Sequence, residues 1–381
     1  MTKTWLTNAA IAGWISANAV LVLLYGLLGT KGHAAITAAV LIAPLVAISR
    51  KFRPIPADYL FAALAALVVA SVVVNGRTAT GREYALLAIS MVYYPAFRAV
   101  GHRFDPRRFS YMTAAIVVVG TLLTAWGVVY DRSGEFKPLV FGFSEGPTVF
   151  SLTWCFLVFA LLSMNLSARQ WRVAGGLIAL PSFVFAAAMV RHPFIALALS
   201  FAASAIKTGG RRQIAALSIV CLTIFIGLAA RPAMSGKIIG LVVENAQKPV
   251  VACDTKDTLA IRIILTKEAL NLLPKAGLVG QGIGTFAQRS CYKAEPHNVV
   301  LQAAVEVGAA AALILVAVFT LGLMSAGRQA RFDAVASFVF AGLVFVGIEF
   351  LMSGSLTNSA LLFGFMGWAV GLRQSDGREI R

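Results

Sequence analysis

Three side chains that can bind or move charge stand out because each lies beside a long apolar run. Arg191 lies in MVRHPFIAL, Arg262 in DTLAIRIILTKEALNLLPK, and His297 opens HNVVLQAAVEVGAAAALILVAVF. A planar guanidinium matches phosphate oxygens, and an imidazole titrates near neutral pH. Together the three groups predict binding of a phosphate-bearing lipid or a similar anion. Each also has a structural alternative: Arg191 as an interfacial anchor, Arg262 as a snorkelling side chain, and His297 as a helix cap.

The composition places these residues in a membrane protein. The chain has 381 residues, 59% of them hydrophobic and 13% charged, and its mean hydropathy is +0.81. Soluble domains carry about 25% charged residues, and apolar runs of about 20 residues recur here along most of the chain. The net charge of +17 comes largely from Lys and Arg in loops between apolar runs, which is how membrane proteins encode orientation. The sequence therefore predicts an all-α polytopic membrane protein and no nucleic-acid partner.

We expect twelve transmembrane helices organised as one integrated domain, with both termini in the cytoplasm. The first apolar run lacks a convincing cleavage site and is expected to be retained as a helix. The N-terminal bundle is residues 1–230, a long outer loop is residues 231–296, and the C-terminal helices are residues 297–381. The predicted spans are 8–28, 33–49, 57–75, 83–100, 110–130, 146–165, 173–190, 193–206, 213–230, 297–324, 333–352 and 355–372. The eighth is short for a full crossing.

The outer loop is net positive, which favours an anionic partner. It contains a predicted helix, residues 257–275, whose solvated face carries Lys267, Glu268, Asn271 and Lys275. Arg262 lies on the other side among leucines. A cation there is costly unless it meets an anion or reaches the headgroups.

A glycine-rich stretch, GLVGQGIGTF, follows that helix. Gly280, Gly282 and Gly284 imitate a phosphate-binding loop, but no strand precedes them and no Lys-Ser or Lys-Thr follows. We therefore expect no nucleotide site. The alternative is a glycine-rich turn that brings the backbone close to a ligand other than a nucleotide.

Two inward-running helices are predicted to begin at the outer face with basic residues. Pro193 suits the first turn of the eighth helix, which places Arg191 and His192 at its N-terminus. His297 and Asn298 open the tenth helix in the same way. Free amides and the helix dipole favour negative charge at such ends.

Arg191 before a short helix, Arg262 in a long outer loop, the glycine stretch and the Pro-His-Asn that opens a helix resemble the O-antigen ligase and O-antigen polymerase superfamily. The resemblance is strongest over residues 191–323. It implies a GT-C-like membrane glycosyltransferase of the bacterial inner membrane, with its active site facing the periplasm. Such enzymes take a glycan from an undecaprenyl diphosphate carrier. A ligase passes it to lipid A core in lipopolysaccharide biosynthesis, and a polymerase passes it to another repeat unit.

The resemblance also implies roles for single residues. Arg191 and Arg262 would bind the donor diphosphate, and His297 would be the base for the acceptor hydroxyl. The supporting residues would be His192, Asn298, Gly282, Gly284 and Glu349. No cofactor and no metal are expected. Ligation is our first expectation, polymerisation of O-antigen or exopolysaccharide is the alternative, and a twelve-helix secondary transporter is a more distant one.

Four acidic residues leave questions open. Asp254 and Asp257 in the outer loop could bind a cation, although two loop carboxylates are a weak signal. Glu306 and Glu349 lie within predicted spans, where an acid is either functional or held in a structural ion pair or hydrogen bond. Glu349 could orient His297 or receive the acceptor proton.

Cys253 and Cys291 both lie in the outer loop and bracket the helix that bears Arg262, whereas Cys155 and Cys221 lie in apolar spans. In an oxidising periplasm, two cysteines of one translocated loop are expected to pair. A disulfide would hold Arg262 and the glycine stretch over His297. Two free thiols are the alternative.

Overall fold

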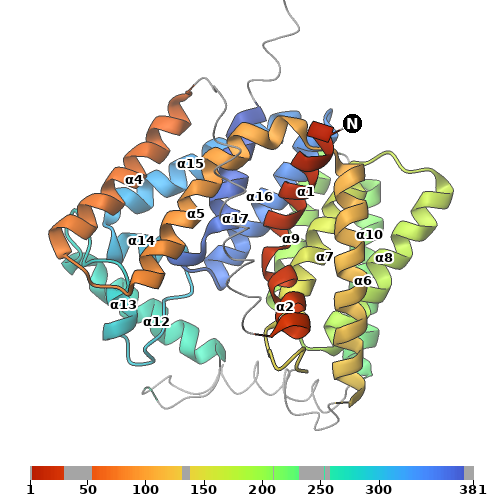
Figure 1. Cartoon of the computed structure of the whole chain (residues 1–381), viewed down its shortest axis with the longest axis horizontal. Helices are drawn as coiled ribbons and strands as arrows, with labels where there is room; N and C mark the ends of the chain where they lie inside the picture. The colour runs from red at the N-terminus through yellow and green to blue at the C-terminus, as the bar shows by residue number, and fades with distance from the viewer. Residues whose placement is uncertain are drawn as a thin grey trace, which may run out of the picture. The chain divides into compact units, whose positions relative to one another are not determined.

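The computed structural model describes residues 2–29, 54–130, 138–208, 210–230, 253 and 258–372. Within these residues the regular structure consists of 15 α-helices and short 3-10 helices, with no strand (Figure 1). The all-α class predicted from the apolar runs is confirmed.

Five helices are long and apolar enough to cross a membrane, so the protein is a multi-pass membrane protein. They are α4 (Pro56–Asn75), α6 (Pro106–Tyr130), α7 (Gly146–Ser163), α15 (Ala309–Gln329) and α16 (Ala334–Met352). A sixth span arises if α1 (Thr2–Ile15) and α2 (Ala17–Leu28), which meet at 80°, are counted as one bent crossing. Twelve spans are predicted from the sequence, so the described residues support that number only in part.

The other predicted spans agree with the structure to different extents. The second, residues 33–49, lies outside the described residues. The fourth, seventh and ninth are helices: α5 (Gly81–Val100), α8 (Ala168–Ala187) and α10 (Arg211–Ala229). The eighth, α9 (His192–Thr208), is longer than predicted. The twelfth is the 12-residue α17 (Ala360–Gly371), preceded by the 3-10 helix η3 (Leu356–Asn358).

The tenth predicted span is two helices rather than one. α14 (Val299–Glu306) ends before Gly308, and α15 begins at Ala309. Gly308 has a φ of 115°, and a Cβ at this position would lie 2.1 Å from the carbonyl oxygen of Leu278. Both facts require glycine. The break is hidden in the sequence because alanines follow Gly308 and make the run look continuous.

The helices form two compact units, each assembled from three stretches of chain. Unit 1 comprises Met1–Ala47, Val100–Val242 and Ala326–Phe345, and unit 2 comprises Ile48–Ala99, Val243–Ser325 and Val346–Arg381. The three segments expected from the sequence, residues 1–230, 231–296 and 297–381, stay a prediction.

Unit 1 is centred on α7, nearly all of which is buried and which packs against α6, α8 and α9. Gly120 of α6 allows a close approach, because a Cβ there would lie 2.3 Å from the ring of Phe150. The indole N–H of Trp154 donates to the Leu177 carbonyl over 3.0 Å and ties α7 to α8.

Unit 2 contains a buried ion pair between two of its long helices. Arg98 Nε of α5 lies 3.3 Å from Asp58 Oδ1 of α4, and the Tyr94 hydroxyl donates to the same oxygen over 3.0 Å. The amide of Ile55 donates to Asp58 Oδ2 over 2.8 Å. Both carboxylate oxygens therefore have donors, which is what makes a buried charge tolerable.

The described part of the outer loop also belongs to unit 2 and is helical, as predicted. It holds α12 (Thr258–Leu272), the 3-10 helix η2 (Leu273–Lys275) and α13 (Thr285–Arg289). Leu265 and Ala269 of α12 form one apolar cluster with Phe286 of α13 and Val305 of α14. Burial of this cluster brings the helix of Arg262 against the helix that follows His297.

Candidate functional site

His297 lies in a turn immediately before α14, and its backbone is in the left-handed region at φ 53°. Such a φ is uncommon for a residue other than glycine. Asn298 is the N-cap of α14, because its side-chain oxygen accepts from the amides of Val300 and Leu301, each at 3.1 Å. The structural alternative in which His297 caps the helix is therefore wrong. The imidazole, which is half-buried, has no part in the cap.

Arg262 projects from α12 and is half-buried. Its Nε atom is buried, and none of the described residues forms a hydrogen bond with it. Burial lowers the pKa of the guanidinium, and the negative charge of Glu349 partly opposes that effect. A buried guanidinium nitrogen without a hydrogen-bond partner can bind an anion without first breaking a protein hydrogen bond at that atom.

Arg262 and His297 act on each other electrostatically. Burial lowers the pKa of the His297 imidazole from its ordinary value of 6.5, and the positive charge of Arg262 lowers it further. The imidazole is therefore neutral at neutral pH, which is the form that can accept a proton.

Glu349 of α16 is buried, with 7% of its surface exposed. The hydroxyl of Ser353 donates to its Oε2 atom over 3.3 Å. Its charge acts on Arg262. The site thus contains a cation, a neutral base and an acid that come from α12, from the turn before α14 and from α16.

The glycine-rich stretch wraps around the end of α14. The amides of Gln281 and Gly282 donate to the carbonyls of Val305 and Glu306 over 2.9 and 3.0 Å. A Cβ on Gly280 would lie 2.3 Å from the carbonyl oxygen of Glu306. A Cβ on Gly282 would lie 2.7 Å from the side-chain oxygen of Thr78. Three of these glycines, Gly280, Gly282 and Gly284, have positive φ. Backbone packing explains them, and a role for Gly282 and Gly284 at the donor stays a prediction.

Glu306 is fully buried, and its carboxyl group contacts the backbone of the glycine-rich stretch. Its Oε1 atom accepts from the amide of Phe286 over 3.3 Å, and its carboxylate also accepts from the backbone of Gly284. Its Oε2 atom accepts from the side-chain Nε2 of Gln302 over 3.0 Å. Of the two readings for this acid, the structure shows the hydrogen-bonded, structural one.

Glu295 is a further acid of this region that our sequence reasoning does not single out. Burial raises the pKa of its carboxyl group, and side-chain hydrogen bonds from Ser355, Gln302 and Thr357 oppose that rise. An acid two residues before His297 in an outer loop is the signal that could have identified it.

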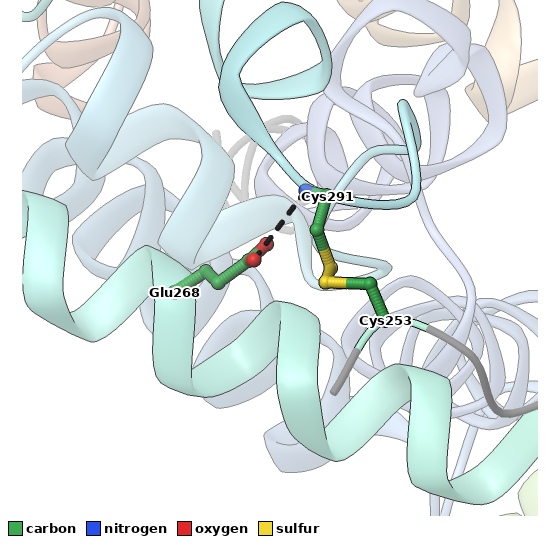
Figure 2. A group of neighbouring side chains, drawn as sticks. All are labelled: Cys253, Glu268 and Cys291. Atoms are coloured by element: carbon green, nitrogen blue, oxygen red, sulfur yellow. Dashed lines mark hydrogen bonds between the residues drawn. A yellow bond between two sulfur atoms is a disulfide. The ribbon is translucent and has the colours of Figure 1, made fainter. Parts of the chain in front are cut away.

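Cys253 and Cys291 form the disulfide expected from the sequence, with their Cα atoms 5.9 Å apart (Figure 2). Glu268 of α12 lies beside it, and its Oε1 atom accepts from the amide of Cys291 over 3.4 Å (Figure 2). Glu268 is half-buried rather than on a solvated face, which corrects its predicted position. Ligand atoms of these three residues lie within 4.8 Å of one another, but the sulfur atoms are bonded together and are not thiolates. Asp254 and Asp257 lie outside the described residues.

Arg191 and His192 lie at the start of α9, as predicted. Arg191 is exposed and follows a tight turn in which buried Met189 has a φ of 63°. Arg191 belongs to unit 1, whereas Arg262 and His297 belong to unit 2. Convergence of Arg191 with the other two therefore stays a prediction.

A scan of the chain against models of known protein families finds no match, and a search of curated proteins finds no relative.

Proposed function

We propose that this protein is a membrane glycosyltransferase that moves a glycan from an undecaprenyl diphosphate carrier to a sugar hydroxyl at the periplasmic face of the inner membrane. Ligation onto lipid A core is the preferred version of the proposal. The observation that carries it is the pairing of Arg262 with His297, since one group suits a diphosphate and the other suits a hydroxyl proton.

In the proposed reaction, the acceptor oxygen attacks C1 of the sugar that is attached to the diphosphate. The bond between C1 and the phosphate oxygen breaks, and its electron pair leaves with the lipid diphosphate. Arg262 stabilises the negative charge that gathers on that leaving group. The acceptor proton moves to the neutral imidazole of His297, whose lowered pKa keeps it ready as a base.

Glu349 has a place in the same proposal. Its charge partly offsets that of Arg262 while no donor is bound, which lowers the cost of keeping a guanidinium half-buried. When a diphosphate arrives, the guanidinium gains a second anionic partner.

The test is transfer by purified protein in liposomes, with a lipid diphosphate-linked glycan as donor and lipid A core as acceptor. Arg191→Ala and His297→Ala should remain in the membrane and lose transfer. Wild-type rates in both variants would remove these residues from the mechanism. Net movement of the donor across the bilayer without a new glycosidic bond would identify a transporter.

Deletion of the gene separates the ligase from the polymerase. A ligase defect leaves long polymer on its carrier, whereas a polymerase defect leaves single repeat units. Accumulation of single repeats would therefore replace ligation with polymerisation in the proposal.

A further inference from the structure

The turn between α4 and α5, residues 76–80, packs directly against the glycine-rich stretch of unit 2. The hydroxyl of Thr78 donates to the carbonyl of Ile283 over 2.8 Å. The side-chain nitrogen of Asn75, the last residue of α4, donates to the carbonyl of Gly280 over 3.4 Å. The end of a long apolar helix is thereby joined to the segment that leads to His297.

Gln288 brings three cations together at this contact. Its side-chain nitrogen donates to the carbonyl of Thr78, the residue after Arg77. Its backbone carbonyl accepts from Lys293 Nζ over 2.6 Å, and Arg289 is the next residue along the chain. All three cations are exposed and belong to unit 2. We call Arg77, Arg289 and Lys293 the Gln288 basic cluster.

The charge of this cluster is not neutralised by the described part of the protein, where no carboxylate forms an ion pair with any of its three members. Lys293 donates to a backbone carbonyl, and Arg289 donates to the side-chain oxygen of Gln281. The neighbouring acid, Glu83, is engaged elsewhere, because its Oε2 atom accepts from the amide and the hydroxyl of Thr80 over 2.7 and 2.8 Å. The cluster therefore presents positive charge to an external anion.

Exposed apolar side chains lie beside the cluster. Val73 and Val74, in the last turn of α4, are exposed, and α4 is long and apolar enough to cross a membrane. Arg77 follows two residues after that helix ends. Leu278 is 84% exposed, and its carbonyl lies against Gly308, the residue before the apolar helix α15. Cations at the ends of such helices lie at the level of lipid headgroups.

The place of Arg77 in the chain also points to a local anion. The turn at 76–80 contacts the segment that leads to His297, so both lie on one face of unit 2, which is expected to be the outer one. Short loops on the outer face are depleted of Lys and Arg. A headgroup phosphate gives an arginine at this position a binding partner.

We propose that the Gln288 basic cluster binds the phosphate group of an anionic phospholipid from the leaflet around the end of α4. The two guanidinium groups bind phosphate oxygens, and Lys293 adds a third positive charge. The acyl chains lie along the exposed valines of α4. The bound lipid strengthens the attachment of the turn at 76–80 to the glycine-rich stretch. This site does not depend on the proposed glycosyl transfer.

The test is lipid binding by the full-length protein, purified in a neutral detergent and titrated with phosphatidylglycerol or phosphatidylcholine. Thermal unfolding and native mass spectrometry report binding, since a ligand of the folded state raises the unfolding midpoint. Phosphatidylglycerol should bind more tightly than phosphatidylcholine. Combining Arg77→Gln, Arg289→Gln and Lys293→Gln should weaken phosphatidylglycerol binding about 10²-fold, at about fivefold for each cation near an anionic surface. Equal binding by this triple variant and the wild type would overturn the site.

A single variant guards against a folding defect. Arg77 forms no hydrogen bond with another described residue, so Arg77→Gln removes a charge without removing a protein contact. It should unfold at the wild-type midpoint without lipid and bind phosphatidylglycerol about fivefold more weakly. Lys267→Gln, which alters an exposed cation of α12, should bind as the wild type does. An equal loss in Lys267→Gln would show general charge attraction and overturn the site.

Two further ligands distinguish a phospholipid from other sources of phosphate. Inorganic phosphate lacks acyl chains and should raise the unfolding midpoint of the wild type and the triple variant equally. Lipid A core in phosphatidylcholine nanodiscs should also bind the two proteins equally. If only inorganic phosphate or only lipid A core binds the triple variant more weakly, and phosphatidylglycerol does not, the assignment to a phospholipid is wrong.

Discussion

The backbone amide of Phe286 donates to Glu306 Oε1 over 3.3 Å, so the glycine-rich stretch binds a carboxyl group of the protein itself. The sequence of this stretch imitates a phosphate-binding loop because both structures need positive φ and close backbone approach. Here the approach is to the last turn of α14. The amides of Gly284 and Phe286 are thereby occupied, which leaves side chains such as Arg262 to meet an external phosphate.

Two glycine substitutions distinguish the energetic cost of a left-handed backbone from the cost of a steric clash with a neighbouring backbone. Gly277 has a φ of 66° and open space where a Cβ would be, so Gly277→Ala should cost about 1 kcal/mol of unfolding free energy. Gly308→Ala would place a Cβ 2.1 Å from the Leu278 carbonyl oxygen and should cost about 3 kcal/mol or more. Thermal unfolding of the purified variants measures the difference. Equal costs at the two positions would show that the contact at Gly308 relaxes freely.

Removal of the Arg262 guanidinium should abolish most catalysis. Arg262→Ala should lower kcat about 10² to 10³-fold if the guanidinium stabilises the leaving diphosphate. Arg262→Lys should rescue poorly, because an ammonium lacks the planar fork. Lys267→Ala is the matched control, since Lys267 is an exposed cation on the same helix. Turnover in Arg262→Ala at the level of Lys267→Ala would exclude this role.

The low pKa of His297 predicts a defined pH dependence. The folded protein favours the neutral imidazole, so its contribution to stability is present above the ordinary pKa of 6.5 and is lost as the pH falls below it. For the same reason, the acid limb of kcat/KM should lie below pH 6.5.

Replacing Arg262 should move this titration upward. In Arg262→Gln one of the two causes of the lowered pKa is removed, while burial remains. The pH profile of diethyl pyrocarbonate modification at His297 should therefore shift to higher pH. The profile of Lys267→Gln should match the wild type. A downward shift in Arg262→Gln would contradict the charge interaction.

The disulfide gives a prediction that needs no substrate. In unreduced, denatured protein, thiol labelling should reach Cys155 and Cys221 and spare Cys253 and Cys291. Cys253→Ser should lower the unfolding free energy by up to about 4 kcal/mol in the chain-entropy model. Cys221→Ser, which alters an exposed free cysteine, should have little effect. Labelling of all four cysteines before reduction would show that the bridge does not form.

Local sequence patterns predicted several features of both units. The pairing of Cys253 with Cys291 follows from their being the only cysteines of one outer loop, and the helix around Arg262 follows from its own residues. The start of α9 follows from Pro193. Each of these features depends on residues that are near in sequence or on a compartment rule.

Long-range contacts account for what the sequence hides. A helical wheel puts Glu268 on the solvated face, yet the amide of Cys291 draws it inward. Gly308 breaks a continuous apolar run only because the Leu278 carbonyl passes beside it. Glu306 looks like an isolated membrane acid until the amide of Phe286 is brought to it. The spacing of apolar residues along the sequence does not predict these contacts, because tertiary packing determines them.

The ion pair between Asp58 and Arg98 has a consequence for how the chain is made. The charged residues lie near the first turn of α4 and the last turn of α5, so each helix would carry an unmatched charge if it left the translocon alone. Such a charge costs about 2.5 to 3.5 kcal/mol at the centre of a helix and less near its ends. Because both charges lie near helix ends, we expect the ion pair to favour joint insertion of α4 and α5 only modestly over insertion of one helix at a time.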